Sequence, residues 1–191
     1  MRLILASKSP RRQQLLESAG FSFEIRTKDI FEEYPPHIPL TEVPLYLARL
    51  KAEAFVQELL EGDLLITSDT VVIQNQEIIG KPLHLNDAKK ILNNLSGQMH
   101  EVWSGVCLRT VDKEVGFSEQ TFVYFQELSE AEIDHYLYTN PPLDKAGAYG
   151  IQDWIGLIGV RKIEGCFYNV MGLPVSRLYQ EIRLHFPDAL T

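Results

Sequence analysis

The sequence predicts a mixed α/β fold in which one sheet is flanked by helices. Short apolar runs bounded by turn residues predict strands, as at 3–6 and 21–26. Segments with helical spacing of apolar residues stand among them, most clearly 44–62 and 175–186. The order of elements does not alternate strictly between strand and helix, and no G-x-G-x-x-G motif is present. We therefore expect a mixed sheet rather than a dinucleotide-binding domain.

The first predicted strand leads directly into a helix. Ser9 stands at the expected N-cap position, Pro10 at the first helical position, and Gly20 at the end. The polar, Pro-rich stretch 29–44 then predicts a loop before the next helix.

The middle of the chain predicts a hairpin followed by a helix. Two apolar arms within 63–82 meet at a turn near Asn75 and Gln76. The helix is expected over 86–97, with Asn86 as its N-cap.

Two long strands are expected next, over 100–111 and 115–128. Ser129 and Glu132 have the capping-box spacing of a following helix. The apolar and β-branched run 156–170 is expected to form a closing hairpin.

Length and composition limit the classes of function. A chain of 191 residues with 45% hydrophobic residues suits one domain, compact or elongated with two lobes. Its net charge of −8 argues against non-specific binding to nucleic acid. No apolar run is long enough for a membrane span or a signal peptide. Cys107 and Cys166 are far apart in sequence, so we expect free thiols and a cytoplasmic location.

The segment "SKSPRR" places two arginines in the first turn of a helix, where the helix dipole is already positive. Hydroxyls from Ser7 and Ser9, together with first-turn amides, suit a phosphate group. An anion bound there would make Arg11 and Arg12 favourable. The alternative is that both guanidiniums are solvated or pair with surface acids.

The segment "ITSDTVVI" sets Asp69 between two apolar runs, where an unpaired carboxylate would be costly. The sequence leaves open whether Asp69 binds a metal, acts as a general base or caps a turn. Lys81 follows the second arm of the predicted hairpin, so we expect it at the same end as Asp69. Lys51 lies near the apolar stripe of its helix, where a lysine commonly extends its ammonium to solvent.

The scattered histidines have no zinc-binding spacing, so any metal is expected to be a hard ion, Mg²⁺ or Mn²⁺. Glu32 and Glu33, in the Pro-rich loop, are either solvated or supply a second carboxylate for that ion. In "LDKAGAYGIQ", the amide of Gln152 offers a donor and an acceptor that match the edge of a uracil or thymine base. An ordinary Gly-rich loop is the alternative.

Six segments together resemble one family. In order, they are "LASKSPRR", "SDTVV", "GKP", "LSGQMHEVWSGV", "DKAGAYGIQ" and "YNVMGLPV". Their order and spacing, over about residues 3–180, are similar to those of the Maf-like nucleoside triphosphate pyrophosphatases. The resemblance implies a single domain over 1–191, with an elongated mixed sheet and two lobes around a central cleft, as in inosine triphosphate pyrophosphatases. It also implies cleavage of a nucleoside triphosphate to the monophosphate and pyrophosphate with a divalent cation.

The resemblance also assigns roles to residues. Asp69 matches the catalytic proton acceptor, and the substrate-specificity positions fall on Arg11, Thr70 and Gln152. Cleft positions expected to bind phosphate fall on Ser7, Arg12, Lys51 and Lys81, and the metal would be held by Glu32 and Asp69.

The form "DKAGAYGIQ" resembles the subfamily that acts on dTTP and UTP. A nucleoside triphosphate is thus the expected partner, without nucleic acid or membrane, and a homodimer is left open. Two alternatives remain: a nucleotide-sensing regulator of septum formation with incidental hydrolysis, and a 7-methyl-GTP pyrophosphatase. The expected cellular role is nucleotide-pool cleaning or arrest of cell division.

Overall fold

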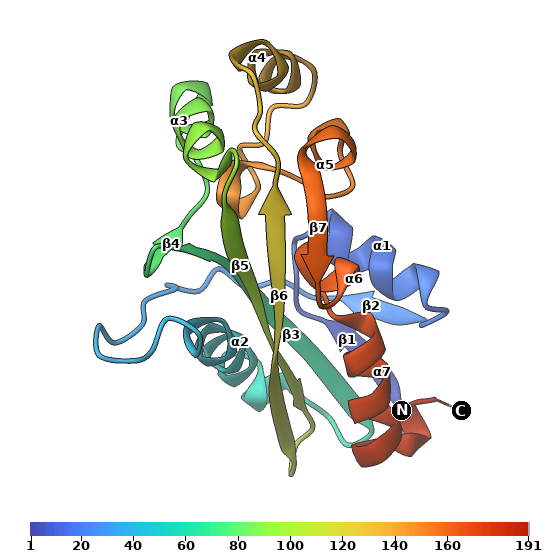
Figure 1. The fold of residues 1–191 in the computed structure, drawn as a ribbon. Helices are drawn as coiled ribbons and strands as arrows, with labels where there is room; N and C mark the ends of the chain where they lie inside the picture. The colour runs from blue at the N-terminus through green and yellow to red at the C-terminus, as the bar shows by residue number, and fades with distance from the viewer. Residues whose placement is uncertain (191) are drawn as a thin grey trace. The chain divides into compact units, whose positions relative to one another are not determined.

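The computed structural model describes residues 1–190, which form two compact units. Unit 1 comprises Met1–Thr70, Ser104–Glu119 and the chain from Gly172 onward, and unit 2 comprises Val71–Trp103 and Gln120–Met171. Figure 1 shows strands and helices in both units. No helix within residues 1–190 combines the length and the apolar character needed to cross a membrane.

Seven strands form one mixed sheet, with β2-β1-β3-β5-β6-β7 as its order and β4 paired to β3. The pairs β1–β2 and β1–β3 are parallel, whereas β3–β4 and β6–β7 are antiparallel. The strands are β1 (Arg2–Leu5), β2 (Phe23–Ile25), β3 (Asp63–Gln74), β4 (Glu77–Ile79), β5 (Met99–Arg109), β6 (Glu114–Phe125) and β7 (Val160–Glu164). The predicted mixed α/β class is confirmed.

Unit 1 contains the helices α1 (Pro10–Ser18), α2 (Val43–Glu53) and α7 (Val175–His185), with short 3-10 turns at Val56–Glu58 and Pro187–Ala189. Its core joins α2 to the sheet, because Ala48 and Ala52 pack with Ile4 and Leu65. Gly105 in β5 allows this close approach: a Cβ there would lie 2.1 Å from the backbone nitrogen of Leu45. A glycine is therefore needed at the point where α2 meets the sheet.

Unit 2 contains α3 (Leu85–Leu95), α4 (Glu130–Thr139), α5 (Trp154–Gly159) and α6 (Phe167–Val170), with a 3-10 turn at Ala146–Ala148. Its core is apolar and aromatic, and includes Leu92, Phe125, Ile133, Tyr136 and Ile155.

Local signals placed several elements correctly. Asn75 and Gln76 both have positive φ, and they form the turn of the β3–β4 hairpin. Ser129 and Glu132 form the predicted capping box. Gly20, also at positive φ, follows α1 as expected.

Ser9 occupies the predicted N-cap position of α1, although its side chain makes no capping bond; its own N–H bonds to the Ser7 hydroxyl instead. Two other predictions of local structure were wrong. The cap of α3 is His84, whose Nδ1 accepts from the Asp87 N–H, rather than Asn86. The segment 156–170 contains the end of α5, then β7 and α6, and is not a hairpin. A short apolar run fits a strand and a buried helix equally well, and only tertiary packing distinguishes them.

Replacement of Gly105 by alanine should destabilise the chain strongly. The added methyl group would overlap the backbone of α2 rather than a flexible side chain. We expect the free energy of unfolding to fall by about 3 kcal/mol or more, as for severe overpacking. Urea unfolding of Gly105→Ala measures this, with Gly80→Ala as control because that position has no neighbour within 4 Å. Equal stability of the two variants would contradict the contact.

Stability should also fall in mild acid because of His100. Burial lowers the pKa of this imidazole from 6.5 to about 4. The unfolded chain therefore binds a proton below pH 6.5 that the folded chain does not, so stability declines from about pH 6.5 down to 4. The loss attributable to this group is roughly 3 kcal/mol.

Unfolding free energies of His100→Gln and wild type, compared between pH 7 and 4, test this expectation. The variant should lose less stability over that range, whereas His37→Gln, at an exposed position, should follow wild type. Parallel pH profiles for all three proteins would refute it.

Candidate active site

Lys51 joins two carboxylates in unit 1. Its ammonium lies 2.6 Å from Asp69 Oδ1 and 3.0 Å from Glu32 Oε1. The side chains of Lys51 and Asp69 are each only 14% exposed, so the pair is weakly screened by solvent. Lys51 comes from the last turn of α2, Asp69 from β3 and Glu32 from the loop before α2.

Strand alternation determines which side chains share the face of Asp69. Successive residues of β3 point to opposite sides, so Thr67 and Asp69 share one face. Thr67 donates to the carbonyl of Ala48 in α2, and Asp69 contacts Lys51 of the same helix. Two polar contacts thus fix this part of β3 against α2, and the aliphatic stem of Lys51 runs along a packed face rather than into solvent.

The opposite face of β3 is held by Arg12. Its Nη1 donates to the Ser68 carbonyl at 2.8 Å, its Nε to the Gly172 carbonyl at 2.9 Å, and its Nη2 to the Thr70 hydroxyl at 3.1 Å. Burial lowers the pKa of this guanidinium. Arg12 therefore ties α1 to β3 and to the segment before α7.

Thr70 and Ser7 are ordered by the same group of contacts. The Thr70 hydroxyl shares a 2.8 Å hydrogen bond with Ser104 and donates to the Gly172 carbonyl at 3.3 Å. Ser7 is buried, and its hydroxyl accepts from the N–H of Ser9 at 3.2 Å. Sequence reasoning assigned no role to Ser104 or Gly172, although both lie in segments that carry the family resemblance.

Seven of the nine residues selected from the sequence lie in unit 1, and most of them are in mutual contact. The other two, Lys81 and Gln152, belong to unit 2. Both have exposed side chains. Gln152 is part of a turn from Gly150 to Asp153, closed by a 3.0 Å bond from the Asp153 N–H to the Gly150 carbonyl.

The carboxylates of Glu32 and Asp69 have the chemistry that a hard divalent cation requires. Glu32 Oε1 and Asp69 Oδ1 both contact the ammonium of Lys51, so these two carboxylate oxygens converge on one point. Within residues 1–190, no three His, Cys, Asp or Glu side chains gather as a metal-binding group. The two carboxylates would thus supply part of a coordination sphere, as is usual for Mg²⁺ bound together with substrate phosphates and water.

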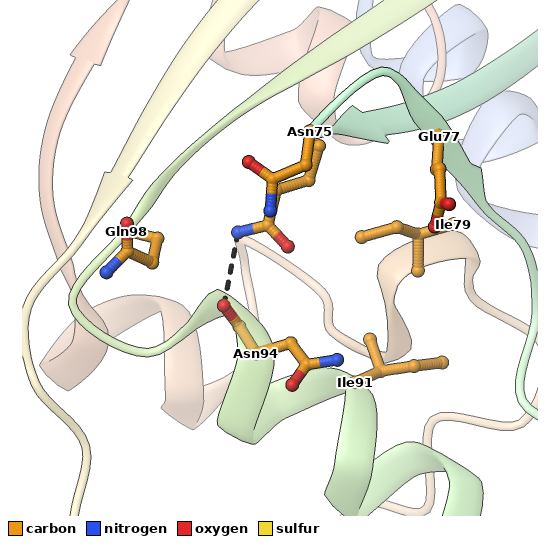
Figure 2. A pocket seen from close by; sticks show the side chains of 7 residues that line it. Asn75, Glu77, Ile79, Ile91, Asn94 and Gln98 are labelled. Atoms are coloured by element: carbon orange, nitrogen blue, oxygen red, sulfur yellow. Dashed lines mark hydrogen bonds between the residues drawn. The ribbon is translucent and has the colours of Figure 1, made fainter.

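A pocket of about 470 Å³ in unit 2 does not suit a triphosphate. Figure 2 shows Ile79 and Ile91 beside it, together with neutral amide side chains. Its lining residues are Gln74, Asn75, Glu77, Ile79, Ile91, Asn94 and Gln98, and none of these carries positive charge. No residue predicted to bind substrate is among them.

Comparison with known proteins places the chain in a family. The model of the family described as Maf-like protein matches residues 2–185. The chain is 50% identical over 186 residues to the dTTP/UTP pyrophosphatase of Parabacteroides distasonis, covering 97% of this chain and 96% of that protein. It is 48% identical to the dTTP/UTP pyrophosphatase of Cytophaga hutchinsonii, covering 98% and 86%.

Among solved structures, the chain is similar to a dITP/XTP pyrophosphatase from Mycobacterium abscessus, with a TM-score of 0.42 and 18% identity over 65% of this chain and 73% of that one. The family match extends over nearly the whole sequence and includes every residue of the candidate site. The chain therefore belongs to the Maf-like protein family.

Proposed function

We propose that this chain hydrolyses dTTP and UTP to the nucleoside monophosphate and pyrophosphate. Relatives that are 44–50% identical over most of the chain are named dTTP/UTP pyrophosphatase. The observation that carries the proposal is the close pairing of Asp69 with Lys51, because it places a largely buried carboxylate beside a cation.

Asp69 acts as the general base. Its carboxylate takes a proton from water, the water oxygen bonds to the α-phosphorus, and the bond from that phosphorus to the bridging oxygen breaks, releasing pyrophosphate. Lys51 holds the Asp69 carboxylate in place through their ion pair, and its ammonium can also interact with the phosphate oxygens.

The phosphates interact with cations and donors of several segments. Arg11 and Ser7, at the start of α1, and Lys81, in unit 2, are the proposed phosphate contacts besides Lys51. Arg11 also contributes to selection between nucleotides. Arg12 has a different part, because its donors are taken by two carbonyls and the Thr70 hydroxyl. We propose that Arg12 orders Thr70 and the peptide before Asp69. Arg12 would contact phosphate only through N–H donors that these bonds leave available.

Thr70 and Gln152 are the proposed contacts that select the nucleotide. The carboxamide of Gln152 can donate to a carbonyl oxygen and accept from the imide N–H of uracil or thymine. Cytosine presents the reverse pattern at part of this edge, so the amide distinguishes the two bases.

A divalent cation, Mg²⁺ or Mn²⁺, is proposed to bind Glu32 and Asp69. When bound, it would neutralise charge on the phosphate oxygens.

Product analysis tests the reaction class. Incubation with dTTP and Mg²⁺ should yield dTMP and pyrophosphate in equal amounts, measured by anion-exchange chromatography. Release of orthophosphate and dTDP would contradict cleavage at the α-phosphorus. Binding of dTTP without turnover, in either metal, would favour the nucleotide-sensing alternative.

Asp69→Asn should reduce kcat by a hundredfold or more, the usual contribution of a general base. The amide has the size of the carboxylate but cannot accept the proton. The matched control is Asp29→Asn, because Asp29 is an exposed acid that also pairs with a lysine, Lys8. Near-normal turnover by the Asp69 variant would remove Asp69 from this role.

Arg11 and Arg12 should differ when each is replaced by alanine. Arg12→Ala removes the guanidinium donors from the carbonyls of Ser68 and Gly172, so the free energy of unfolding should fall by about 3 kcal/mol. Arg11→Ala should change the order of preference among nucleotides. Urea unfolding and kcat/KM for dTTP, UTP, dCTP and GTP measure both effects. An Arg12 variant as stable as wild type, or an unchanged order in the Arg11 variant, would refute the division of roles.

A further inference from the structure

The turn that carries Gln152 is held by a single buried hydroxyl. Tyr136, on α4, is fully buried, and its hydroxyl lies between the two ends of the Gly150–Asp153 turn. It accepts from the Gly150 N–H at 3.2 Å and donates to Asp153 Oδ2 at 2.8 Å. Together with the bond from the Asp153 N–H to the Gly150 carbonyl, these contacts make a closed ring.

Asp153 does not make the helix-capping bond expected at its position. Asp153 stands at the N-cap position of α5, where an aspartate ordinarily accepts from backbone N–H groups of the first turn. Its side chain makes no such bond, and its carboxylate instead folds back over Gly150 toward the Tyr136 hydroxyl. A Cβ at Gly150 would lie 2.5 Å from Asp153 Oδ2, so glycine is required for this fold-back.

Within the Gly150–Asp153 turn, Gln152 is the residue that faces outward. Gly150 and Ile151 are buried, whereas the side chain of Gln152 is exposed. The ammonium of Lys145 lies 3.7 Å from Asp153 Oδ2, so a positive charge stands beside the same oxygen. Burial and the neighbouring carboxylate raise the pKa of Tyr136, so the hydroxyl remains a donor throughout the range in which the protein is folded.

We propose that Tyr136 is a positioning residue for nucleobase selection, which fixes the direction of Gln152 through its bonds to Gly150 and Asp153. The inference rests on the proposed function, because it gives Gln152 a base to recognise. A carboxamide selects between bases only when its donor and acceptor are held in a fixed orientation, and a free turn would let it rotate between them.

Tyr136→Phe tests the proposal because it removes the hydroxyl and keeps the buried ring. The ratio of kcat/KM for dTTP to that for dCTP should fall about tenfold. A loss of folded protein would lower kcat/KM for dTTP and for dCTP by the same factor and leave this ratio unchanged. The ratio therefore separates a positioning role from an effect on stability. Tyr124→Phe is the matched control, since Tyr124 donates to Glu164 on β7 outside the turn, and it should keep the wild-type ratio.

A second pair of variants tests the partner. Asp153→Asn retains a carbonyl oxygen for the Tyr136 hydroxyl and should keep most of the selectivity, whereas Asp153→Ala should resemble Tyr136→Phe. Combining Tyr136→Phe with Gln152→Ala should lower the ratio no further than Gln152→Ala alone. Additive losses would overturn the proposal, because Tyr136 would then act independently of Gln152.

Amide hydrogen exchange provides a readout that does not need activity. The Gly150 N–H should exchange at least tenfold faster in Tyr136→Phe than in wild type. Unchanged exchange at Gly150, or a wild-type ratio in Tyr136→Phe, would overturn the inference while leaving the proposed function in place. A wild-type chain that hydrolyses dTTP and dCTP equally well would instead refute the proposed selectivity, and the role of Tyr136 in it.

Discussion

The candidate site of unit 1 depends on the ion pair between Lys51 and Asp69. A carboxylate with 14% exposure in the middle of a strand is costly unless a cation accompanies it, and the ammonium at 2.6 Å supplies that cation. The position of α2 then follows from the pair, because α2 must lie close enough to β3 for Lys51 to reach. Gly105 permits that approach by presenting no side chain to the backbone of Leu45. A packing constraint and an electrostatic one thus fix the same helix.

Asp69 and Thr70 are adjacent in sequence but face different helices. Asp69 contacts Lys51 of α2, whereas Thr70 contacts Arg12 of α1. Two neighbouring residues of one strand therefore bring groups from both helices to the same point of the sheet. The Asp69–Thr70 peptide is held from both sides, which fixes the carboxylate of Asp69 and the hydroxyl of Thr70 relative to each other.

Local signals in the sequence placed several turns and helix ends but not the contacts between distant residues. Gly20, the Asn75–Gln76 turn and the Ser129–Glu132 capping box act within a few residues, and each was placed correctly. The partner of Arg12 at Gly172 is 160 residues away, and no local pattern indicates a bond to a backbone carbonyl. The helix α5 was missed because a short apolar run fits a strand and a buried helix equally well. Residue types and the family resemblance selected the candidate residues, and only the fold could show which of their side chains contact each other.

The positive charges at the start of α1 have a physical explanation in these contacts. A guanidinium beside a helix N-terminus is unfavourable when it remains near the first-turn amides. Arg12 avoids this by donating to the carbonyls of Ser68 and Gly172, whose oxygens carry partial negative charge. Its charge is thus balanced within the protein, at the expense of a lowered pKa from burial.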